Sequence, residues 1–295
     1  MTIRFRRFIF WIFVILFTIA SIIVILFAQG WRFDFNYFKI VKTGGIFIKT
    51  TVSGAKIYVN DKFIGSTAGL LTYTKLINNL TPKNYNLFIH KEGYYAWNKT
   101  VEVKNGLVSE MLSIILLPLD LKKVKVAELP RQIISDFFID DKTIKIINDK
   151  KTGATKFYDM NGSFMSNQKI KVATSTELIS PDNNKKLYSD NGQIWINYLS
   201  DIKEEPSKRA GEKEMIIASE TPVLFFDWFK DSEHIIWLTA SELTIAERDN
   251  RGGKRNSVKF YLNINSPIFW DNKNSTLYFF ETAEKKSILY KINIG

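Results

Sequence analysis

The residues that could carry chemistry in this sequence are few. Among 295 residues there are two histidines, His90 and His234, and no cysteine. The missing cysteine excludes a disulfide framework, thiolate zinc, a thiol nucleophile and a lipid-modified N-terminal cysteine. Neither histidine has a second ligand at the spacings that zinc sites use, so we expect structural roles for both. With no nucleophile, phosphate-loop or metalloprotease motif either, the sequence predicts a protein without catalysis, cofactor or metal.

Four aspartates offer the remaining acid chemistry. Each follows an apolar stretch and precedes a hydrophobic strand: Asp140, Asp182, Asp231 and Asp271. Two such carboxylates in one cleft could cleave a glycan. The runs Asp140-Asp141 and Asp182-Asn183-Asn184 could be considered for calcium. No bidentate Glu stands at the offset that a calcium loop needs. Because an Asp at a tight turn accepts backbone N–H bonds, we expect turn chemistry at all four.

Two charged segments are expected to be exposed. Residues 203–214 alternate in sign and are typical of a solvated loop, with binding as the alternative. Residues 248–255, RDNRGGKR, predict a basic hairpin tip. A plain exposed turn is expected there, and contact with an anionic polymer is the alternative.

The elements that would position these residues begin with a membrane span. The segment from Phe8 to Ala28 is 21 residues long and uncharged. As a helix it would be about 31 Å long, which matches the hydrocarbon core of a bilayer. Arginines precede it and no comparable cluster follows, so the positive-inside rule predicts a single-pass protein with a cytoplasmic N-terminus and an extracytoplasmic remainder. A cleaved signal peptide is the alternative, because Ala28-Gln29-Gly30 loosely resembles a cleavage site, although the apolar run is longer than such a peptide needs.

The segment directly after the span is aromatic. Residues 31–38, WRFDFNYF, alternate aromatic and polar side chains. Such a segment is typical of rings at the level of the lipid headgroups, and equally of a half-buried strand. Both interpretations stay open.

The net charge of +11 divides unevenly along the chain. Residues 31–125 carry 14 basic and 6 acidic side chains, whereas residues 126–295 carry 24 of each. The predicted divisions are a cytoplasmic arm with the span (1–30), a juxtamembrane segment (31–43), a basic region (44–121) and a neutral region (122–295). Because the basic region lies outside the cytoplasm, we expect no nucleic acid partner.

Beyond residue 31 the fold class is mainly β, because short alternating runs bounded by Gly, Asn, Asp and Pro dominate. In the basic region, Ala55, Ile57 and Val59 alternate onto one face of a strand, and Asn60-Asp61 follows as a turn. Strands over 97–103 and 112–116, with Asn105-Gly106 between them, predict a hairpin. Short antiparallel strands of this kind predict a small β-sandwich.

The same region resembles a known family, the PEGA domain. The resemblance runs from about Gly44 to Leu119 and rests on a series of short motifs: Ser53-Gly54-Ala55 before KIYVND, Gly65-Ser66-Thr67 after it, Tyr85 at the start of YNLFIHKEGYYAW (which contains Gly93 and Tyr94), and Val101-Glu102-Val103 followed by Asn105-Gly106. The resemblance implies a small sandwich of extracytoplasmic and surface-layer-associated proteins. It implies an adhesion or spacer module and no catalytic residues.

The neutral region contains an internal repeat. The four aspartates are 42, 49 and 40 residues apart, the length of a four-stranded propeller blade. Within the second unit, Ser180-Pro181-Asp182 and the run Asp190 to Trp195 look like the repeats of TolB-type periplasmic propellers. Tryptophans at Trp195, Trp228, Trp237 and Trp270 have the spacing of residues that pack between blades, although sugar-binding rings would look the same. We predict a four-unit β-propeller-like domain, with an incomplete array as the alternative.

These observations favour a membrane-anchored extracytoplasmic cell-envelope protein with a binding or structural role. Its expected partners are the lipid bilayer, through residues 8–28, and a cell-wall or surface polymer or other envelope proteins. One alternative is an exported glycan-active hydrolase or lyase that uses the turn aspartates. The other is an accessory sensor subunit, which would need a membrane partner because Met1 to Arg7 is too short for an output domain.

Overall fold

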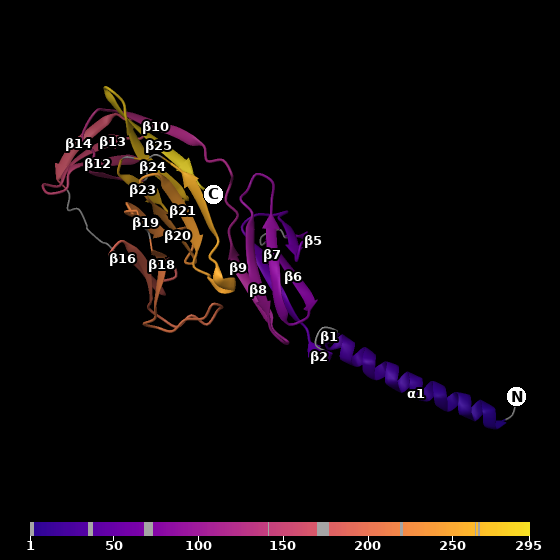
Figure 1. Ribbon diagram of the computed structural model, residues 1–295. Coiled ribbons are helices and arrows are strands. Elements are labelled where there is room, and N and C mark those ends of the chain that lie inside the picture. The colour runs from indigo at the N-terminus through magenta and orange to yellow at the C-terminus, as the bar shows by residue number, and fades with distance from the viewer. Residues whose placement is uncertain are drawn as a thin grey trace. The chain divides into compact units, whose positions relative to one another are not determined.

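The computed structural model describes residues 3–34, 38–67, 73–140, 142–169, 177–218, 221–262, 264 and 266–295. Asp141 and residues 35–37 of the aromatic segment lie outside this set. One long helix is followed by strands (Figure 1). Beyond that helix, the described residues contain a single helical turn, η1 (Arg251–Gly253), so the predicted mainly β fold class is confirmed.

Helix α1 (Ile3–Ala28) contains the predicted span. It is long and apolar enough to cross a membrane, and none of its described residues is buried against the rest of the chain. The hydroxyls of Thr18 and Ser21 each donate to the backbone carbonyl four residues earlier, at 2.9 and 2.8 Å. Because hydrocarbon offers no hydrogen-bond partner, this internal pairing suits a lipid environment.

The chain forms two compact units. The first contains residues 1–91 and 96–116, and the second contains residues 92–95 and 117–295. In the first unit a short hairpin of β1 (Trp31–Asp34) and β2 (Lys39–Lys42) follows the helix. A two-layer sandwich comes next, in which Ile46, Ile57 and Leu87 are fully buried. Its three-stranded sheet is β6 (Tyr73–Leu80), β3 (Gly44–Thr50) and β9 (Val108–Ile114), and its four-stranded sheet is β5 (Lys62–Ser66), β4 (Lys56–Val59), β7 (Lys83–His90) and β8 (Trp97–Val103).

The prediction of a hairpin around Asn105-Gly106 is wrong. Strand β8 belongs to the four-stranded sheet, whereas β9 crosses to the other sheet and pairs with β3 in parallel. Gly44, at the start of β3, allows the close approach, since a Cβ there would lie 2.4 Å from the carbonyl oxygen of Leu107. The Asn-Gly turn thus changes sheets instead of returning the chain along its own sheet.

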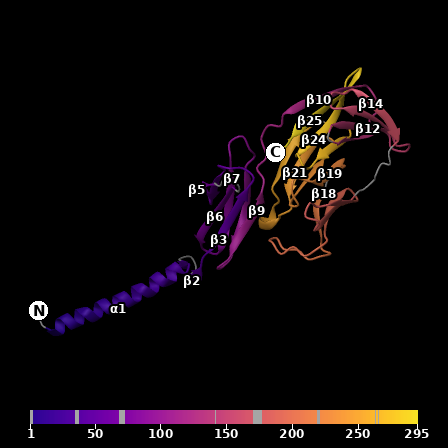
Figure 2. The ribbon, with the colours of Figure 1, turned by 180° about the vertical axis from the view of Figure 1, so that it is seen from behind.

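The second unit consists of four antiparallel sheets of four strands each, which we number as blades 1 to 4 (Figure 2). This confirms the predicted four-unit propeller-like repeat. Blade 1 is β11 (Asp136–Asp140), β12 (Thr143–Asp149), β13 (Ala154–Asp159) and β14 (Phe164–Lys169); blade 2 is β15 (Glu177–Ile179), β16 (Lys185–Asp190), β17 (Gln193–Tyr198) and β18 (Lys213–Ala218); blade 3 is β19 (Phe225–Trp228), β20 (His234–Leu238), β21 (Glu242–Glu247) and β22 (Ser257–Tyr261).

Blade 4 includes a strand from the beginning of the second unit. It contains β23 (Ile268–Asp271), β24 (Thr276–Thr282), β25 (Lys286–Asn293) and, outermost, β10 (Lys123–Pro130). The antiparallel pairing of β10 with β25 joins the first and last strands of the repeat region. This shared strand stabilises the array because blade 4 cannot be completed without it.

Apolar side chains and a repeated tryptophan contact join neighbouring blades. One buried cluster brings Phe137 and Ile146 of blade 1 against Phe280 and Leu289 of blade 4. The indole of Trp270 donates to the carbonyl of Trp228 at 3.1 Å, and the indole of Trp228 donates to that of Leu178 at 3.1 Å. Both tryptophans are almost fully buried, so they pack between blades.

Candidate functional site

The four repeat aspartates occupy one structural position. Each lies at the turn between the first and second strands of its blade, where Asp140 and Asp271 are the last residues of β11 and β23. Asp182 and Asp231 lie inside longer turns of blades 2 and 3. Asp182 accepts the backbone N–H of Asn184 at 3.0 Å, and Asp231 that of Glu233 at 2.8 Å. The sequence pattern therefore corresponds to turns at equivalent places in the fold.

Blades 2 and 3 use the same local pairing. The carboxylate of Asp182 accepts from the ammonium of Lys185 at 2.7 Å, and that of Asp231 contacts Nδ1 of His234 at 3.0 Å. Both pairs are three residues apart, and Lys185 and His234 each begin the second strand of their blade. His234 is buried and anchored to its own turn, and His90 of the sandwich stacks on Phe88. Their surroundings are those of structural residues.

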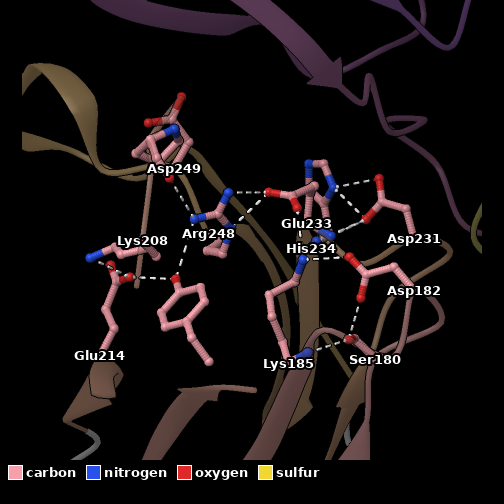
Figure 3. Close-up of polar contacts among 12 residues, drawn as sticks. Ser180, Asp182, Lys185, Lys208, Glu214, Asp231, Glu233, His234, Arg248 and Asp249 are labelled. Atoms are coloured by element: carbon pink, nitrogen blue, oxygen red, sulfur yellow. Dashed lines mark hydrogen bonds and ion pairs between the residues drawn. The ribbon is translucent and has the colours of Figure 1, made fainter. Parts of the chain in front are cut away.

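The two turns join into one charged network across the interface of blades 2 and 3 (Figure 3). Lys185, only 1% exposed, also pairs with Glu233 of blade 3 at 3.0 Å. The other oxygen of Glu233 accepts from the guanidinium of Arg248 at 2.7 Å, and Arg248 is 2% exposed. The backbone N–H of Asp182 donates to the hydroxyl of Ser232 at 2.9 Å. One carboxylate thus compensates two buried cations.

The network continues into both charged segments. Arg248 donates to the hydroxyl of Tyr198 at 3.2 Å, and that hydroxyl donates to Glu214 at 2.7 Å. Glu214 also pairs with Lys208 at 3.1 Å and with Arg255. The expectation that residues 203–214 and 248–255 are merely solvated is therefore wrong at these positions. Acid–base pairs between the two segments bury part of each.

The pairing explains the perturbed pKa values of the network. Burial raises the pKa of Asp182, but hydrogen bonds from Lys185, Ser180 and the N–H of Asn184 outweigh it and hold the value at about 2. Burial also raises the pKa of Glu214, but the hydrogen bonds from Tyr198 and Lys208 and the charge of Arg255 lower it overall. Burial raises the pKa of the Tyr198 phenol, which stays protonated and donates. Asp182 and Glu214 are therefore ionised at neutral pH and hold cations in place.

One groove of the second unit lies on blade 1. It measures about 790 Å³ and is lined by ten residues: Arg131, Gln132, Ile133, Asn148, Ala154, Thr155, Lys156, Asn167, Gln168 and Lys169. Three of these are cations, four are amides and none is a carboxylate. Its volume falls in the range of small-ligand sites. An open groove of this composition suits an anionic ligand.

Strand register places the cations of the groove together. Lys156 lies opposite Asn167, and Ala154 lies opposite Lys169, so these side chains share one face of β13 and β14. Ile146 is opposite Lys156 and packs into the cluster with blade 4, so Lys156 lies beside that cluster. Arg131 closes one side and donates to the carbonyl of Glu284 at 2.9 Å. The remaining N–H groups of Arg131 are available to a ligand.

The residues of the predicted PEGA-like motif lie at several separate places in the structure. Gly54 and Ala55 meet Thr67, whose hydroxyl accepts the N–H of Ala55 at 3.1 Å and donates to the carbonyl of Val52 at 3.2 Å. Ser53 belongs to the same turn, and Gly65 lies in the neighbouring β5. Tyr85 is buried elsewhere and donates to the carbonyl of Thr81 at 3.0 Å.

Two further motif residues belong with the second unit. The carbonyl of Gly93 accepts the N–H of Leu119 at 2.9 Å, and Tyr94 forms a bridge with Pro118. Sequence reasoning missed the central network residues Lys185, Tyr198, Glu233 and Arg248. One local pattern could have indicated the network: Asp182–Lys185 and Asp231–His234 have the same three-residue spacing. The pairs between blades join residues far apart in the sequence, so no sequence pattern indicates them.

Comparison with known proteins identifies the sandwich. Residues 43–112 match the family model of the PEGA domain, about a quarter of the chain, which confirms the resemblance seen in the sequence. No curated protein matches the chain at a significant level.

Solved structures similar to this chain are β-rich proteins at low identity. Hsv2 from Kluyveromyces lactis is 12% identical, with 80% of this chain and 71% of that chain covered and a TM-score of 0.26. The β-propeller domain of Cps50 (Swd1) from Myceliophteria thermophila is 11% identical, with 70% and 66% covered and a TM-score of 0.28, so this chain spans just under two thirds of it. A protein assigned as TolB from Agrobacterium tumefaciens is 11% identical, with 78% and 79% covered and a TM-score of 0.25. At such scores the propeller assignment rests on the strand pairing of this chain alone.

Proposed function

We propose that this protein is a non-catalytic component of the cell envelope that is anchored by α1 and binds an anionic envelope polymer through the groove on blade 1. The groove carries the proposal. Its lining combines the cations Arg131, Lys156 and Lys169 with amide donors and contains no carboxylate. Phosphodiester and carboxylate groups of a polymer would be attracted by these charges and would accept hydrogen bonds from the amides.

The rest of the chain supports an extracytoplasmic binding role. Helix α1 is long and apolar enough to span a bilayer, and Arg4, Arg6 and Arg7 at its start favour a cytoplasmic N-terminus. The PEGA domain is expected to act as a spacer between the membrane and the propeller-like unit. The charged network between blades 2 and 3 uses its carboxylates to hold cations and thereby to fix loops. This arrangement supports binding more than it supports glycan cleavage.

The binding proposal is tested with the full chain in lipid nanodiscs. The probe is a fluorescently labelled poly(glycerol phosphate), and binding is measured by anisotropy. We expect binding that weakens as salt rises, because exposed charge pairs are screened, and no binding of neutral dextran. The double variant Arg131→Ala/Lys156→Ala should weaken binding by roughly tenfold or more, since each charge-assisted hydrogen bond contributes about 1.5–3 kcal/mol.

Lys142→Ala is the matched control. Lys142 is an exposed cation at the turn between β11 and β12, outside the lining of the groove. This variant removes one charge from the same blade and should bind like the wild type. If the control weakens binding as much as the groove variant, general electrostatic attraction explains the result. If neither variant has an effect, the groove is not the binding site.

Topology is tested separately. Because the chain has no cysteine, a single cysteine introduced at Lys142 or at Ile3 can be labelled without background. In intact cells a membrane-impermeant maleimide should label the Lys142→Cys protein and not the Ile3→Cys protein. The reverse pattern would overturn the extracytoplasmic placement.

A further inference from the structure

The hairpin that follows α1 has two unlike faces. Phe33 is directly opposite Ile40, and Asp34 is directly opposite Lys39. Because opposed residues in an antiparallel pair share a face and successive residues alternate, Phe33 and Ile40 lie on one face, whereas Asp34 and Val41 lie on the other. Asp34 and Val41 are buried at 8% and 7% exposure, while Phe33 and Ile40 are 46% and 61% exposed. The apolar face is therefore the one turned to the surroundings.

More apolar surface adjoins this face. Phe38, just before β2, is 79% exposed, and its ring makes an edge contact with Phe33 at 6.2 Å. Trp31, on the same face, is half-buried and lies opposite Lys42. Aromatic and aliphatic side chains beside a tryptophan and a lysine form the composition that proteins place at a membrane–water interface.

The hairpin is fixed directly to the end of the helix. The guanidinium of Arg32 donates to the carbonyl of Phe27 at 2.7 Å and lies 3.3 Å above the centre of the Phe27 ring. Directly after β2, both the N–H and the hydroxyl of Thr43 donate to the carbonyl of Gly30, at 2.8 and 2.9 Å. Both strands are thus held at the point where the chain leaves α1.

We propose that the face formed by Phe33, Phe38 and Ile40 rests in the interfacial region of the bilayer that α1 spans, as a second and non-spanning membrane contact. This inference rests on the proposed anchoring by α1. The occupant is a lipid surface because β1, the strand that carries Phe33, begins three residues after the helix ends at Ala28. Four-residue strands extend only about 13 Å, so the face cannot leave the neighbourhood of the headgroups.

The contact would have a mechanical consequence. A single helix leaves an attached domain free to rotate and tilt, whereas a second point of contact restricts its orientation. Arg32 connects the hairpin to the sandwich as well, through a hydrogen bond of 3.4 Å to Asn79. The membrane contact would therefore orient the PEGA domain relative to the bilayer.

The test uses single cysteines in the full chain, which has none of its own. An environment-sensitive fluorophore is attached at Ile40→Cys, at Lys39→Cys or at Phe17→Cys, and the protein is reconstituted in vesicles that contain doxyl lipids. At Ile40→Cys we expect blue-shifted emission and strong quenching by doxyl groups near the headgroup. Lys39→Cys, the neighbouring residue on the opposite face, is the matched control and should be quenched several-fold less.

The three labelled positions distinguish failure of the α1 anchor from failure of the proposed hairpin contact. Phe17→Cys, in the middle of α1, should be quenched best by doxyl groups near the end of the acyl chain. If it is not quenched, the anchor itself fails. If Phe17→Cys is quenched while Ile40→Cys and a second variant, Phe33→Cys, are no more quenched than Lys39→Cys, the anchor stands and the hairpin contact is overturned.

Discussion

The ammonium of Lys185 in blade 2 lies 3.0 Å from the carboxylate of Glu233 in blade 3, with Lys185 fully buried and Glu233 partly exposed. Glu233 also holds the buried guanidinium of Arg248 at 2.7 Å. A buried charge without a partner is costly, whereas a partly exposed carboxylate can be solvated by water. Glu233 is therefore the residue on which the interface of the two blades most depends.

Glu233→Gln should lower the free energy of unfolding by about 2–4 kcal/mol, because it leaves two buried cations undercompensated. Lys185 would keep Asp182 as a partner, and Arg248 would keep the Tyr198 hydroxyl and a backbone carbonyl, neither of which is charged. Urea denaturation followed by tryptophan fluorescence measures the change.

Lys185→Met is the matched control. It removes the buried cation but keeps most of its volume, so we expect a change of about 1 kcal/mol or less in either direction. An equal loss in both variants would mean that packing at Lys185, not charge compensation by Glu233, determines the stability of this interface.

Tyr198→Phe should loosen the segment 199–212. The Tyr198 hydroxyl is shared between Glu214 and Arg248. Its removal takes one hydrogen bond from each of these charged groups, at a cost of about 1–3 kcal/mol. Limited proteolysis of the native protein should then cut residues 203–214 faster than in the wild type. Tyr188→Phe, on the same blade, is the control, and equal cleavage rates in the two variants would contradict the role assigned to Tyr198.

Asp227 should make stability depend on pH in the acidic range. Burial in blade 3 raises the pKa of Asp227 from 3.8 to about 6, against a lowering by the backbone N–H of Trp228. The unfolded chain thus releases this proton at lower pH than the folded chain, so the wild type loses stability as pH rises from about 4 to about 6.

Asp227→Asn removes the loss of stability that ionisation of Asp227 causes, and the Asn side chain can still accept the N–H of Trp228. We expect the variant to be more stable than the wild type by about 1–3 kcal/mol at pH 7, and to show little advantage at pH 4. Urea denaturation at both pH values measures the difference. A constant difference at the two pH values would show that the effect is not due to ionisation of Asp227.

Local features of this fold are readable from the sequence. The alternation of Ala55, Ile57 and Val59 corresponds to a buried face of β4. Asn60 and Asp61 both have positive φ, at 47° and 64°, as the two central residues of the hairpin turn between β4 and β5. The repeat aspartates likewise fall at turns, and Asp182, Asp231 and Asp271 accept nearby backbone N–H groups there.

Features that depend on distant residues are not readable in this way. Strand β9 has the same local character whether it pairs with β8 or with β3, and the parallel pairing with β3 depends on the close approach at Gly44. Similarly, Arg248 lies in a segment that looks like a basic exposed turn, and its burial is due to Glu233 and Tyr198. Charge alone does not distinguish a solvated residue from a compensated one.

Gly162→Ala should destabilise the second unit far more than Gly192→Ala. Both glycines have positive φ, at 87° and 77°, so alanine at either position costs about 1 kcal/mol of backbone strain. At Gly192 an added Cβ meets no atom within 4 Å, whereas at Gly162 it would lie 2.2 Å from the carbonyl oxygen of Glu128 on β10. The turn of blade 1 therefore contacts the strand that completes blade 4. Displacing that backbone should add about 2 kcal/mol or more to the loss, measured by urea denaturation of both variants. Equal losses would show that β10 can move away from Gly162 freely, and that its pairing with β25 does not hold blade 4 against blade 1.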